Sequence, residues 1–308
     1  MHVNKLRTLL KAVVDPSTRY ISLAVRGFYN HLPDDEYIHR MFRAKMGYQL
    51  DLEHCSTFNE KLQWLKLYDR KPFYSSIVDK YEVKKYVANI IGEEYTVPTL
   101  GVWNSFEEID FNALPDRYVL KCTHDSGGIY IAKNKDTKSI RASRRILKRS
   151  LKKNYYYLFR EWPYKYVKPR IIAEQYLEGN TRGGIIDYKI HCFNGEPQII
   201  LVCADRFSDT GLTEDFFDTK WNHLAVRRPK YKNSSSKILR PQELDEMLEL
   251  SRRLSKDFLF LRVDFYVVQH RVYIGELTFF PNGGYEKFIP ESFDLKLGDM
   301  LRLPRGEI

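Results

Sequence analysis

Two apolar runs near the end of the chain carry the clearest chemical signal. Residues 261–284 read LRVDFYVVQHRVYIGELTFFPNGG. The runs on either side of QHR predict a β-hairpin, with Asp264 and Glu276 near the middle of its two strands. An unpaired carboxylate inside an apolar strand is costly, so the pair needs a cation. Oxygen ligands without a nearby His or Cys favour Mg²⁺ over Zn²⁺.

Arg262 adds a second interpretation of the same hairpin. It lies two residues before Asp264, so the two side chains are expected on one face of the strand. A structural ion pair between Arg262 and one carboxylate therefore explains the pattern as well as a metal site does. The hairpin alone leaves both interpretations open.

A glycine-containing turn is the next chemical signal. Residues 118–133 read YVLKCTHDSGGIYIAK, which places Lys121 at the end of one strand and Ser126, Gly127 and Gly128 before the next. Adjacent glycines let backbone N–H groups approach a phosphate closely. The pattern matches neither a Walker A loop nor a Rossmann fingerprint, and an ordinary Gly-Gly hairpin fits it equally well.

Three further segments contribute single candidates. Glu174 ends the apolar run IIAEQ, where it could accept a hydrogen bond from an adenine or a ribose, although an exposed strand end is the commoner outcome. Asp187 and Lys189 alternate in DYKIHCF and share a face, so Lys189 could contact a γ-phosphate or a substrate carboxylate, or form a solvated pair. Arg206 ends a strand in CADRF and is a candidate for binding an acidic substrate, or is a surface arginine.

The arrangement of elements predicts an α+β protein. Residues 1–95 have helical patterns, including a T-x-x-E capping box at Thr57 and Glu60. Residues 96–308 mix short strands with helical patterns at 138–153 and 241–255. We therefore expect a helical N-terminal region, followed by strand-rich lobes at about 96–175 and 176–308.

Composition limits the class of protein and its compartment. The chain has 308 residues, 50 Lys and Arg against 40 Asp and Glu, and a net charge of +10, which favours anionic partners. Its four cysteines form no CxxC, which indicates a reducing compartment. Residues 1–20 lack the features of a signal peptide and predict a packed helix, or a helix on a membrane surface. A cytoplasmic protein is expected, with peripheral contact at the inner face of the membrane as the alternative.

A basic, aromatic segment spans residues 141–170. A helix with a solvated basic face and an apolar face of Ile146, Leu147, Leu151 and Leu158 explains it most simply. Contact with an acidic glycan or an anionic membrane comes next, and binding of RNA or single-stranded DNA comes last.

The order of these motifs resembles that of the ATP-grasp ligases and, more closely, the TupA-like ATP-grasp family of cell-surface polysaccharide gene clusters. The segments that carry the resemblance are TFNEKLQWLKL, VDKYEVKKYV, YVLKCTHDSGG, EQYLEG, DYKIHCFNGEP, RVDFY and IGELTFFPNGG. The resemblance implies an ATP-grasp fold, in which two α+β lobes clamp ATP.

The resemblance also implies roles for the nucleotide-binding residues. Lys121 would grip the α- and β-phosphates, and Ser126, Gly127 and Gly128 would lie in the loop that covers them. Lys80, in VDKYEV, would be an earlier nucleotide-facing lysine. The adenine would lie against a hinge made of Glu174, Gln175, Tyr176 and Leu177.

At the phosphate end, Asp264 and Glu276 would hold Mg²⁺ and Arg262 would stabilise the transferred phosphoryl group. D-Alanine–D-alanine ligases have E-x-N where this chain has Glu276-Leu277-Thr278, so Thr278 offers a hydroxyl in place of an amide. Asn282 is a candidate for supplying the missing oxygen. This departure affects the coordination of a second Mg²⁺ ion and not that of the first.

The implied activity is an ATP- and Mg²⁺-dependent carboxylate–amine ligase that acts through an acyl phosphate in the assembly of capsule, teichuronopeptide or O-antigen. Its substrates would be the carboxylate of an acidic sugar, glycan or peptide, and an amine. Two alternatives are a glycosyltransferase, against which the lack of a DxD motif argues, and a non-catalytic module that binds glycan or membrane.

Overall fold

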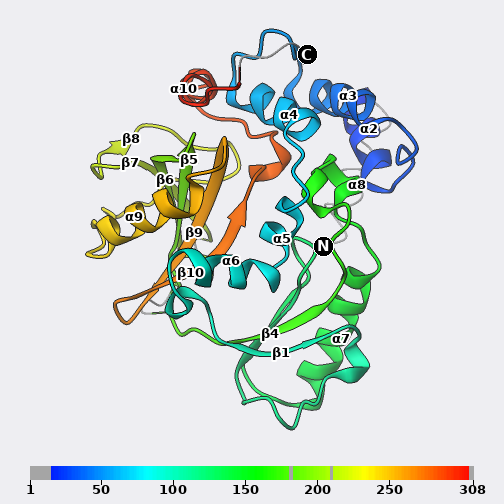
Figure 1. Cartoon of the computed structure of the whole chain (residues 1–308), viewed down its shortest axis with the longest axis vertical. Coiled ribbons are helices and arrows are strands. Elements are labelled where there is room, and N and C mark those ends of the chain that lie inside the picture. The colour runs from blue at the N-terminus through cyan, green and yellow to red at the C-terminus, as the bar shows by residue number, and fades with distance from the viewer. Residues whose placement is uncertain (1–14, 180–182, 209–210, 305–308) are drawn as a thin grey trace.

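The computed structural model describes residues 15–179, 183–208 and 211–304. Helices come first, and two antiparallel sheets follow (Figure 1). The helix expected at the N-terminus falls largely on residues 1–14, outside the described residues. None of the helices in the described ranges combines the length and the apolar composition that crossing a bilayer requires.

The first part of the described chain is helical, as predicted. Its elements are α2 (Pro16–Val25), α3 (Asp34–Met46), α4 (Phe58–Tyr68), α5 (Tyr74–Val78), α6 (Glu82–Ile90) and the 3-10 turn η1 (Glu93–Tyr95). The capping box is confirmed, because the Thr57 hydroxyl accepts from the Glu60 backbone N–H and the Glu60 carboxylate accepts from the Thr57 N–H.

The first sheet has the strand order β1-β4-β2-β3. Its strands are β1 (Thr99–Trp103), β2 (Tyr118–Cys122), β3 (Ile129–Ala132) and β4 (Ile171–Gln175), with the turn η2 (Phe106–Glu108) after β1. Helix α7 (Thr137–Leu151) packs against β2 and β3 through the fully buried Leu147. Its basic residues lie on the other side of the helix.

The helix expected through Leu158 is shorter than predicted. Helix α7 ends at Leu151, and Leu158 belongs to a separate turn, α8 (Tyr156–Phe159), which is followed by η3 (Trp162–Tyr164). The Asn154 side chain accepts from the backbone N–H of Tyr156, so it caps a new turn instead of continuing the old helix. The apolar residues of the segment therefore fall in two separate elements, and Leu147 and Leu151 of α7 belong to the apolar cluster of the first sheet.

The second sheet has the order β10-β9-β5-β6-β7-β8. Its strands are β5 (Asp187–Phe193), β6 (Glu196–Ala204), β7 (Thr213–Asp218), β8 (His223–Leu224), β9 (Phe260–Val268) and β10 (Arg271–Thr278). Helices α9 (Leu244–Ser255) and α10 (Ser292–Met300) complete this part of the chain, with the turn η4 (Pro281–Gly283) between β10 and α10. The predicted hairpin is confirmed, because Gln269 and His270 form the two-residue turn with φ of 49° and 60°.

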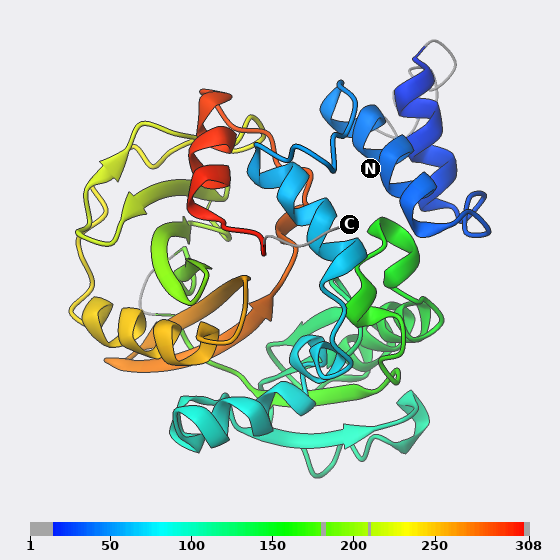
Figure 2. The same ribbon diagram turned by 45° about the horizontal axis from the view of Figure 1, so that its top comes forward.

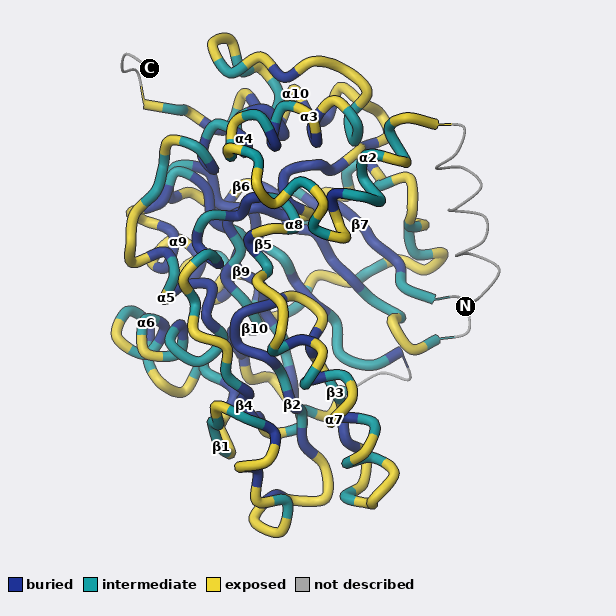
Figure 3. The backbone as a smooth tube through the Cα atoms, turned by 90° about the vertical axis from the view of Figure 1, so that its right-hand side faces the viewer, coloured by how far each residue is buried: buried dark blue, intermediate teal, exposed yellow. Residues whose placement is uncertain are grey.

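Helices α5 and α6 lie between the two sheets (Figures 1 and 2). A bridge between Thr96 and Ile274 joins the end of the helical region to β10. The central strands of the second sheet are largely buried, whereas the far end of the first sheet is more exposed (Figure 3). Lys84, Lys121, Glu174 and Glu276 lie where α6, β2, β4 and β10 meet.

Candidate active site

Glu174 and Lys121 meet on one face of the first sheet. Lys121 on β2 is paired with Ile172 on β4, so Glu174, two residues further along β4, projects to the same side. Lys121 Nζ donates to Glu174 Oε2 at 2.5 Å, and Lys84 Nζ of α6 lies 2.8 Å from Glu174 Oε1. Glu174 is 5% exposed, so its interpretation as an exposed strand end is wrong.

Two ammonium groups therefore hold one buried carboxylate. Burial acts to raise the pKa of Glu174, but Lys121 and Lys84 outweigh it and keep the pKa below its usual value. Burial lowers the pKa of Lys84, although the attraction of Glu174 acts to raise it. With the carboxylate and both ammonium groups charged, the cluster carries an excess positive charge, which suits an anionic ligand.

A pocket begins at this cluster and continues to β10. Apolar side chains from α6, from the segment before β1 and from β10 form its walls, and polar groups lie at its ends. The lining residues are Lys80, Val83, Lys84, Val87, Thr96, Val97, Lys121, Glu174, Ile274, Gly275 and Glu276. The pocket therefore combines apolar walls with a few convergent charges.

Lys80 links the glycine turn to the second sheet. Its backbone N–H donates to the Thr123 carbonyl at 3.0 Å, and its Nζ donates to the Asp125 carbonyl and lies 3.8 Å from Glu276 Oε1. Gly127 has φ of 120° and open space beside its Cα, which leaves room above the turn. By contrast, Gly128 packs tightly against Ser150, and Ser126 is exposed.

The three residues after Glu174 contact residues that come just before β1 and β2. The backbone N–H of Gln175 donates to the Pro98 carbonyl at 3.0 Å. The Tyr176 ring lies 5.2 Å from the guanidinium of Arg117, and Leu177 packs against the apolar cluster that includes Val97.

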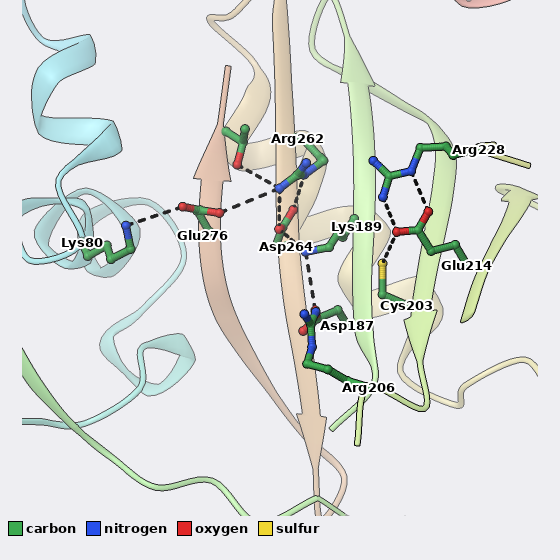
Figure 4. Close-up of polar contacts among 11 residues, drawn as sticks. Lys80, Asp187, Lys189, Cys203, Arg206, Glu214, Arg228, Arg262, Asp264 and Glu276 are labelled. Carbon is green, nitrogen blue, oxygen red and sulfur yellow. Dashed lines mark hydrogen bonds and ion pairs between the residues drawn. The ribbon is translucent and has the colours of Figure 1, made fainter. Parts of the chain in front are cut away.

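The acid end of the site is a row of charges across three strands (Figure 4). Asp264 on β9 is paired with Lys189 on β5 and with Glu276 on β10. Arg262 Nε and Nη2 donate to the two Asp264 oxygens at 2.6 and 2.7 Å, and Lys189 Nζ donates to Oδ2 at 2.5 Å. The same Arg262 Nη2 lies 3.8 Å from Glu276 Oε2, so the two acids share one guanidinium.

The row of charges continues from Lys189 through Asp187 to Arg206, which follows β6. Lys189 Nζ lies 3.7 Å from Asp187 Oδ2, and Arg206 Nη2 donates to the same oxygen at 2.7 Å. The interpretation of Asp187 and Lys189 as a solvated pair is wrong, because both side chains are largely buried and Lys189 contacts Asp264 more closely. The Arg206 side chain is 47% exposed, so part of it faces solvent.

These contacts keep Asp264 ionised although it is 2% exposed. Burial acts to raise its pKa, but Arg262 and Lys189 hold the pKa below its ordinary value. In turn, the attraction of Asp264 overcomes burial and raises the pKa of Lys189 and of Arg262. The ion pair between Arg262 and a hairpin carboxylate is therefore confirmed, and the carboxylate is that of Asp264. Glu276 lies opposite Asp264 on the neighbouring strand.

The two carboxylates of the hairpin differ in how available they are to a cation, because Arg262 and Lys189 already occupy both Asp264 oxygens. Glu276 has the more available carboxylate, because its side chain is 32% exposed and each neighbouring cation is 3.8 Å away. Within residues 15–179, 183–208 and 211–304, no group of three or more His, Cys, Asp or Glu could hold a metal alone. An ion on Asp264 and Glu276 would need phosphate oxygens or water to complete its shell, which is how Mg²⁺ commonly binds.

Thr278 and Asn282 are hydrogen-bonded to different groups. The Thr278 hydroxyl accepts from Arg262 Nη2 at 3.1 Å, next to the acid pair. The Asn282 amide donates to Glu286 Oε1 at 2.6 Å, and Glu286 also pairs with Arg228. Through Glu286, Asn282 joins a neighbouring cluster in which Arg228 also pairs with Glu214. Figure 4 shows the Arg228–Glu214 pair.

The sequence analysis missed Lys84 and the Arg228 cluster. Lys84 follows Lys80 by four residues, a spacing that places both on one helical face and could have identified it. Arg228 lies between Glu214 and Glu286, which are far apart in the sequence, so no local signal pointed to this cluster.

A comparison of the sequence with known protein families identifies the class of protein to which this chain belongs. The sequence profile of the family described as TupA-like ATPgrasp matches residues 60–302. The chain is therefore an ATP-grasp protein, and its two antiparallel sheets with flanking helices are the ATP-grasp fold. Within that class, it belongs to the TupA-like ATPgrasp family.

Solved structures give more distant matches, and no curated protein sequence matches the chain. D-Alanine–D-alanine ligase from Bacillus anthracis complexed with ATP is 19% identical, with a TM-score of 0.43 over 73% of this chain and 63% of that chain. The same enzyme from Helicobacter pylori is 15% identical, with a TM-score of 0.42 over 80% and 70%. An ADP complex of purK, N5-carboxyaminoimidazole ribonucleotide synthetase, is 13% identical, with a TM-score of 0.43 over 72% and 51%. The chain spans less than two thirds of the first and third of these proteins.

Proposed function

We propose that this chain is an ATP- and Mg²⁺-dependent ligase that joins a carboxylate to an amine. The observation that carries the proposal is the pocket between the sheets, with Lys84, Lys121 and Glu174 at one end and Glu276 at the other. Family membership supports ATP as the nucleotide. The apolar walls of the pocket would hold adenine, with Glu174 accepting from its amino group.

The lysines would bind the triphosphate. Lys121 reaches the pocket from β2, and Lys80 reaches it from the turn before α6, beside the glycine turn. Their ammonium groups would contact phosphate oxygens, and the backbone of Ser126, Gly127 and Gly128 would cover them.

The acid row would act at the γ-phosphate. Asp264 and Glu276 would hold Mg²⁺, which when bound neutralises the charge on the β- and γ-phosphates. Arg262 would place its guanidinium beside the transferred phosphoryl group, and Asp264 orients it through two hydrogen bonds. Lys189 and Arg206 would attract the carboxylate substrate.

The chemistry would proceed in two steps. A carboxylate oxygen attacks the γ-phosphorus, the bond to the β-phosphate oxygen breaks and ADP leaves. The amine nitrogen then attacks the carbonyl carbon of the acyl phosphate, inorganic phosphate leaves and the nitrogen loses its proton. Positioning and charge neutralisation supply most of the catalysis in such transfers.

The substrate class follows from charge and from the family resemblance. A net charge of +10 and the cationic end of the row at Arg206 favour an acidic sugar, glycan or peptide as the carboxylate. We place the reaction in the assembly of capsule, teichuronopeptide or O-antigen, in the cytoplasm or at the inner face of the membrane.

The test is phosphate release from ATP with uronic acids and amino acids supplied singly and in pairs. We expect release and a product of matching mass only when a carboxylate, an amine and Mg²⁺ are all present. Asp264→Asn should abolish release, whereas Asp245→Asn, at an exposed site on α9, should not change it. Full turnover by Asp264→Asn, or transfer of a sugar from a nucleotide sugar, would contradict the proposal.

A further inference from the structure

The excess positive charge of the chain is concentrated on one helix. Residues 133–153 contain ten Lys and Arg and a single Asp, so they carry +9 of the net charge of +10, and the rest of the chain carries only +1. Helix α7 spans most of this segment. A charge confined in this way is the electrostatic footprint expected where an anionic partner binds.

Five of these cations form a row along α7. They follow one another at intervals of three or four residues, which places them on one face of the helix, and all five are exposed. Leu147, on the opposite side of the helix, is fully buried against the first sheet, so the row faces outward. The members of this α7 row are Lys138, Arg141, Arg145, Arg149 and Lys152.

Pairing within the chain does not account for the α7 row. Among residues 15–179, 183–208 and 211–304, no ion pair or side-chain hydrogen bond involves any of its five members. Glu107 pairs instead with Arg144 and Lys148, at 3.1 and 2.5 Å, beside the row. Because like charges four residues apart destabilise a helix, the row has a cost that an anionic partner would offset.

Helix α9 shows how a solvated helix of this chain balances its charges. Its sequence LDEMLELSRRLS mixes acidic and basic residues. Arg252 pairs there with Glu249 at 2.6 Å and with Glu196 of β6 at 3.0 Å. The α7 row differs from this arrangement, since it has cations without acids.

One end of the α7 row lies beside the glycine turn. The Ser150 hydroxyl donates to the Asp125 carboxylate, and His124 Nε2 lies 3.3 Å from the Ser150 carbonyl oxygen. Arg149 and Lys152 flank Ser150 in the sequence, so they belong to the end of α7 that contacts this turn. The row extends from there for about 21 Å along the helix axis.

The chemistry of α7 narrows the class of anionic partner. Residues 133–153 contain no aromatic side chain on which a nucleic-acid base could stack. None of the apolar side chains of α7 is exposed, so the helix has nothing to insert into a bilayer. What remains is a line of cations roughly 5–6 Å apart, which suits a linear polymer with one anion per unit.

A chain of uronic acids has these properties. It carries one carboxylate on every sugar, and each sugar ring spans about the interval between neighbouring cations of the row. Linked rings are also stiffer than a polypeptide, so a uronic acid chain loses less conformational entropy on a rigid helix than an acidic peptide does.

We propose that the α7 row binds a linear acidic glycan and directs one end of it toward the glycine turn. This inference rests on the proposed ligase function and specifies the carboxylate substrate as the terminal unit of an extended polyuronate. It also assigns a partner to the basic part of residues 141–170, which the composition of that segment left open.

The test uses a fluorescent oligogalacturonate, with its fully methyl-esterified form as the uncharged counterpart. Both are titrated with the full chain and followed by anisotropy. We expect saturable binding of the acid form only, and weaker binding as NaCl increases, because exposed charges are screened. Affinity should fall at least about tenfold in a variant that lacks four cations of the row. Its substitutions are Arg141→Gln, Arg145→Gln, Arg149→Gln and Lys152→Gln.

A second variant loses the same charge elsewhere. It carries glutamine at four exposed cations of the segment before α9, and it should bind oligogalacturonate as wild type does. Glutamine is a good helix former, so neither variant should have a lower melting temperature. The control substitutions are Lys230→Gln, Lys232→Gln, Lys237→Gln and Arg240→Gln.

Several results would overturn the glycan site. They are equal affinity of both variants for oligogalacturonate, binding of the methyl ester as tight as that of the acid, and tighter binding of oligouridylate, polyglutamate or phosphatidylglycerol vesicles. Bound oligogalacturonate should slow amide exchange in residues 141–152 and in residues 124–128 of the glycine turn. Protection that stops short of the turn would contradict the proposed direction of the chain.

ATP binding separates this inference from the proposed function. The α7 variant should retain the wild-type affinity for Mg²⁺ with a non-hydrolysable ATP analogue, because none of its four positions lines the pocket. Wild type that binds oligogalacturonate but not the analogue would overturn the ligase proposal alone. Wild type that binds the analogue but not oligogalacturonate would overturn the glycan site alone.

Discussion

Glu174 shows how single residues set the charge of the site. The carboxylate is buried, and its two oxygens are divided between Lys121 and Lys84, which come from different elements. Removing it would leave two largely buried ammonium groups without their common partner. The charge balance at this point therefore affects both nucleotide binding and stability.

We predict that Glu174→Gln lowers the free energy of unfolding by about 3 kcal/mol, the cost of breaking a buried ion pair from one side. The pKa of Glu174 is depressed in the folded state. Its stabilisation is therefore complete above the unfolded pKa, near 4.5, and is lost as pH falls through the folded value. Urea unfolding at neutral pH and at progressively lower pH measures both effects.

Glu178→Gln is the matched control for this experiment. Its side chain is 68% exposed and pairs with Arg117 at the surface. The change should stay within about 0.5 kcal/mol at all pH values. An equal loss in both variants would show that the buried cluster has no special role.

The β9–β10 hairpin is the element on which the acid row depends. Its register shifts between Ile274 and Glu276, so a bulge at Gly275 sets the position of Glu276 opposite Asp264. A Cβ built on Gly275 would lie 2.8 Å from Tyr266 Cε2, which is too close. Only glycine lets Tyr266 pack at this point.

Gly275→Ala is therefore expected to displace Glu276 while the sheet remains folded. Because small displacements in a site of this kind are costly, affinity for Mg²⁺ with a non-hydrolysable ATP analogue should fall about tenfold or more, measured by fluorescence titration. Shortening Tyr266 to Leu in the same chain makes room for the methyl group and should recover part of the affinity. Unchanged affinity in Gly275→Ala would show that the bulge does not position the site.

Helix α4 has a structural role that separates stability from ligand binding. Thr57→Ala removes its capping hydroxyl and should lower the free energy of unfolding by about 1 kcal/mol. Affinity for the ATP analogue should not change, because α4 does not line the pocket. Thr137→Ala, at the exposed first residue of α7, should have little effect on either measurement. Denaturant unfolding together with a binding titration checks the prediction.

Local patterns explain what the sequence predicted correctly at this scale. The hairpin around Gln269 and His270 and the capping box at Thr57 depend on neighbouring residues, so they could be recognised directly. The closeness of Arg262 to Asp264 followed from strand alternation. The roles of these residues toward ATP and Mg²⁺ remain predictions.

Long-range contacts explain what the sequence could not predict. Glu174 was expected at a surface because neither Lys84 nor Lys121 is near it in the chain. The position of the turn after α8 depends on Arg160, whose Nη2 donates to carbonyls about 130 residues earlier in the chain. Such contacts leave no periodic signal.

At the scale of the whole molecule, the proposed ATP site is shared between the two sheets. Lys121 and Glu174 come from the first sheet and Glu276 from the second, whereas Lys80 and Lys84 come from the α5–α6 region between them. A nucleotide that bridges these parts should slow the opening of both together.

Hydrogen exchange tests this expectation. We predict that Mg²⁺ with a non-hydrolysable ATP analogue slows amide exchange in residues 118–132 of the first sheet and 271–278 of the second. Helix α10 and the surface around β8 should be unaffected. Protection confined to one sheet would argue against a ligand held between them.

The most direct test is calorimetric titration of the chain with a non-hydrolysable ATP analogue, with Mg²⁺ and then with EDTA. The account predicts one site per chain, weakened by at least about tenfold when Mg²⁺ is removed or when Glu276 is changed to Gln, and unchanged by Glu249→Gln on the exposed face of α9. Absence of binding, or equal affinity in all four conditions, would contradict the claim that acids of the final hairpin and lysines of the opposite lobe hold Mg²⁺ and ATP together.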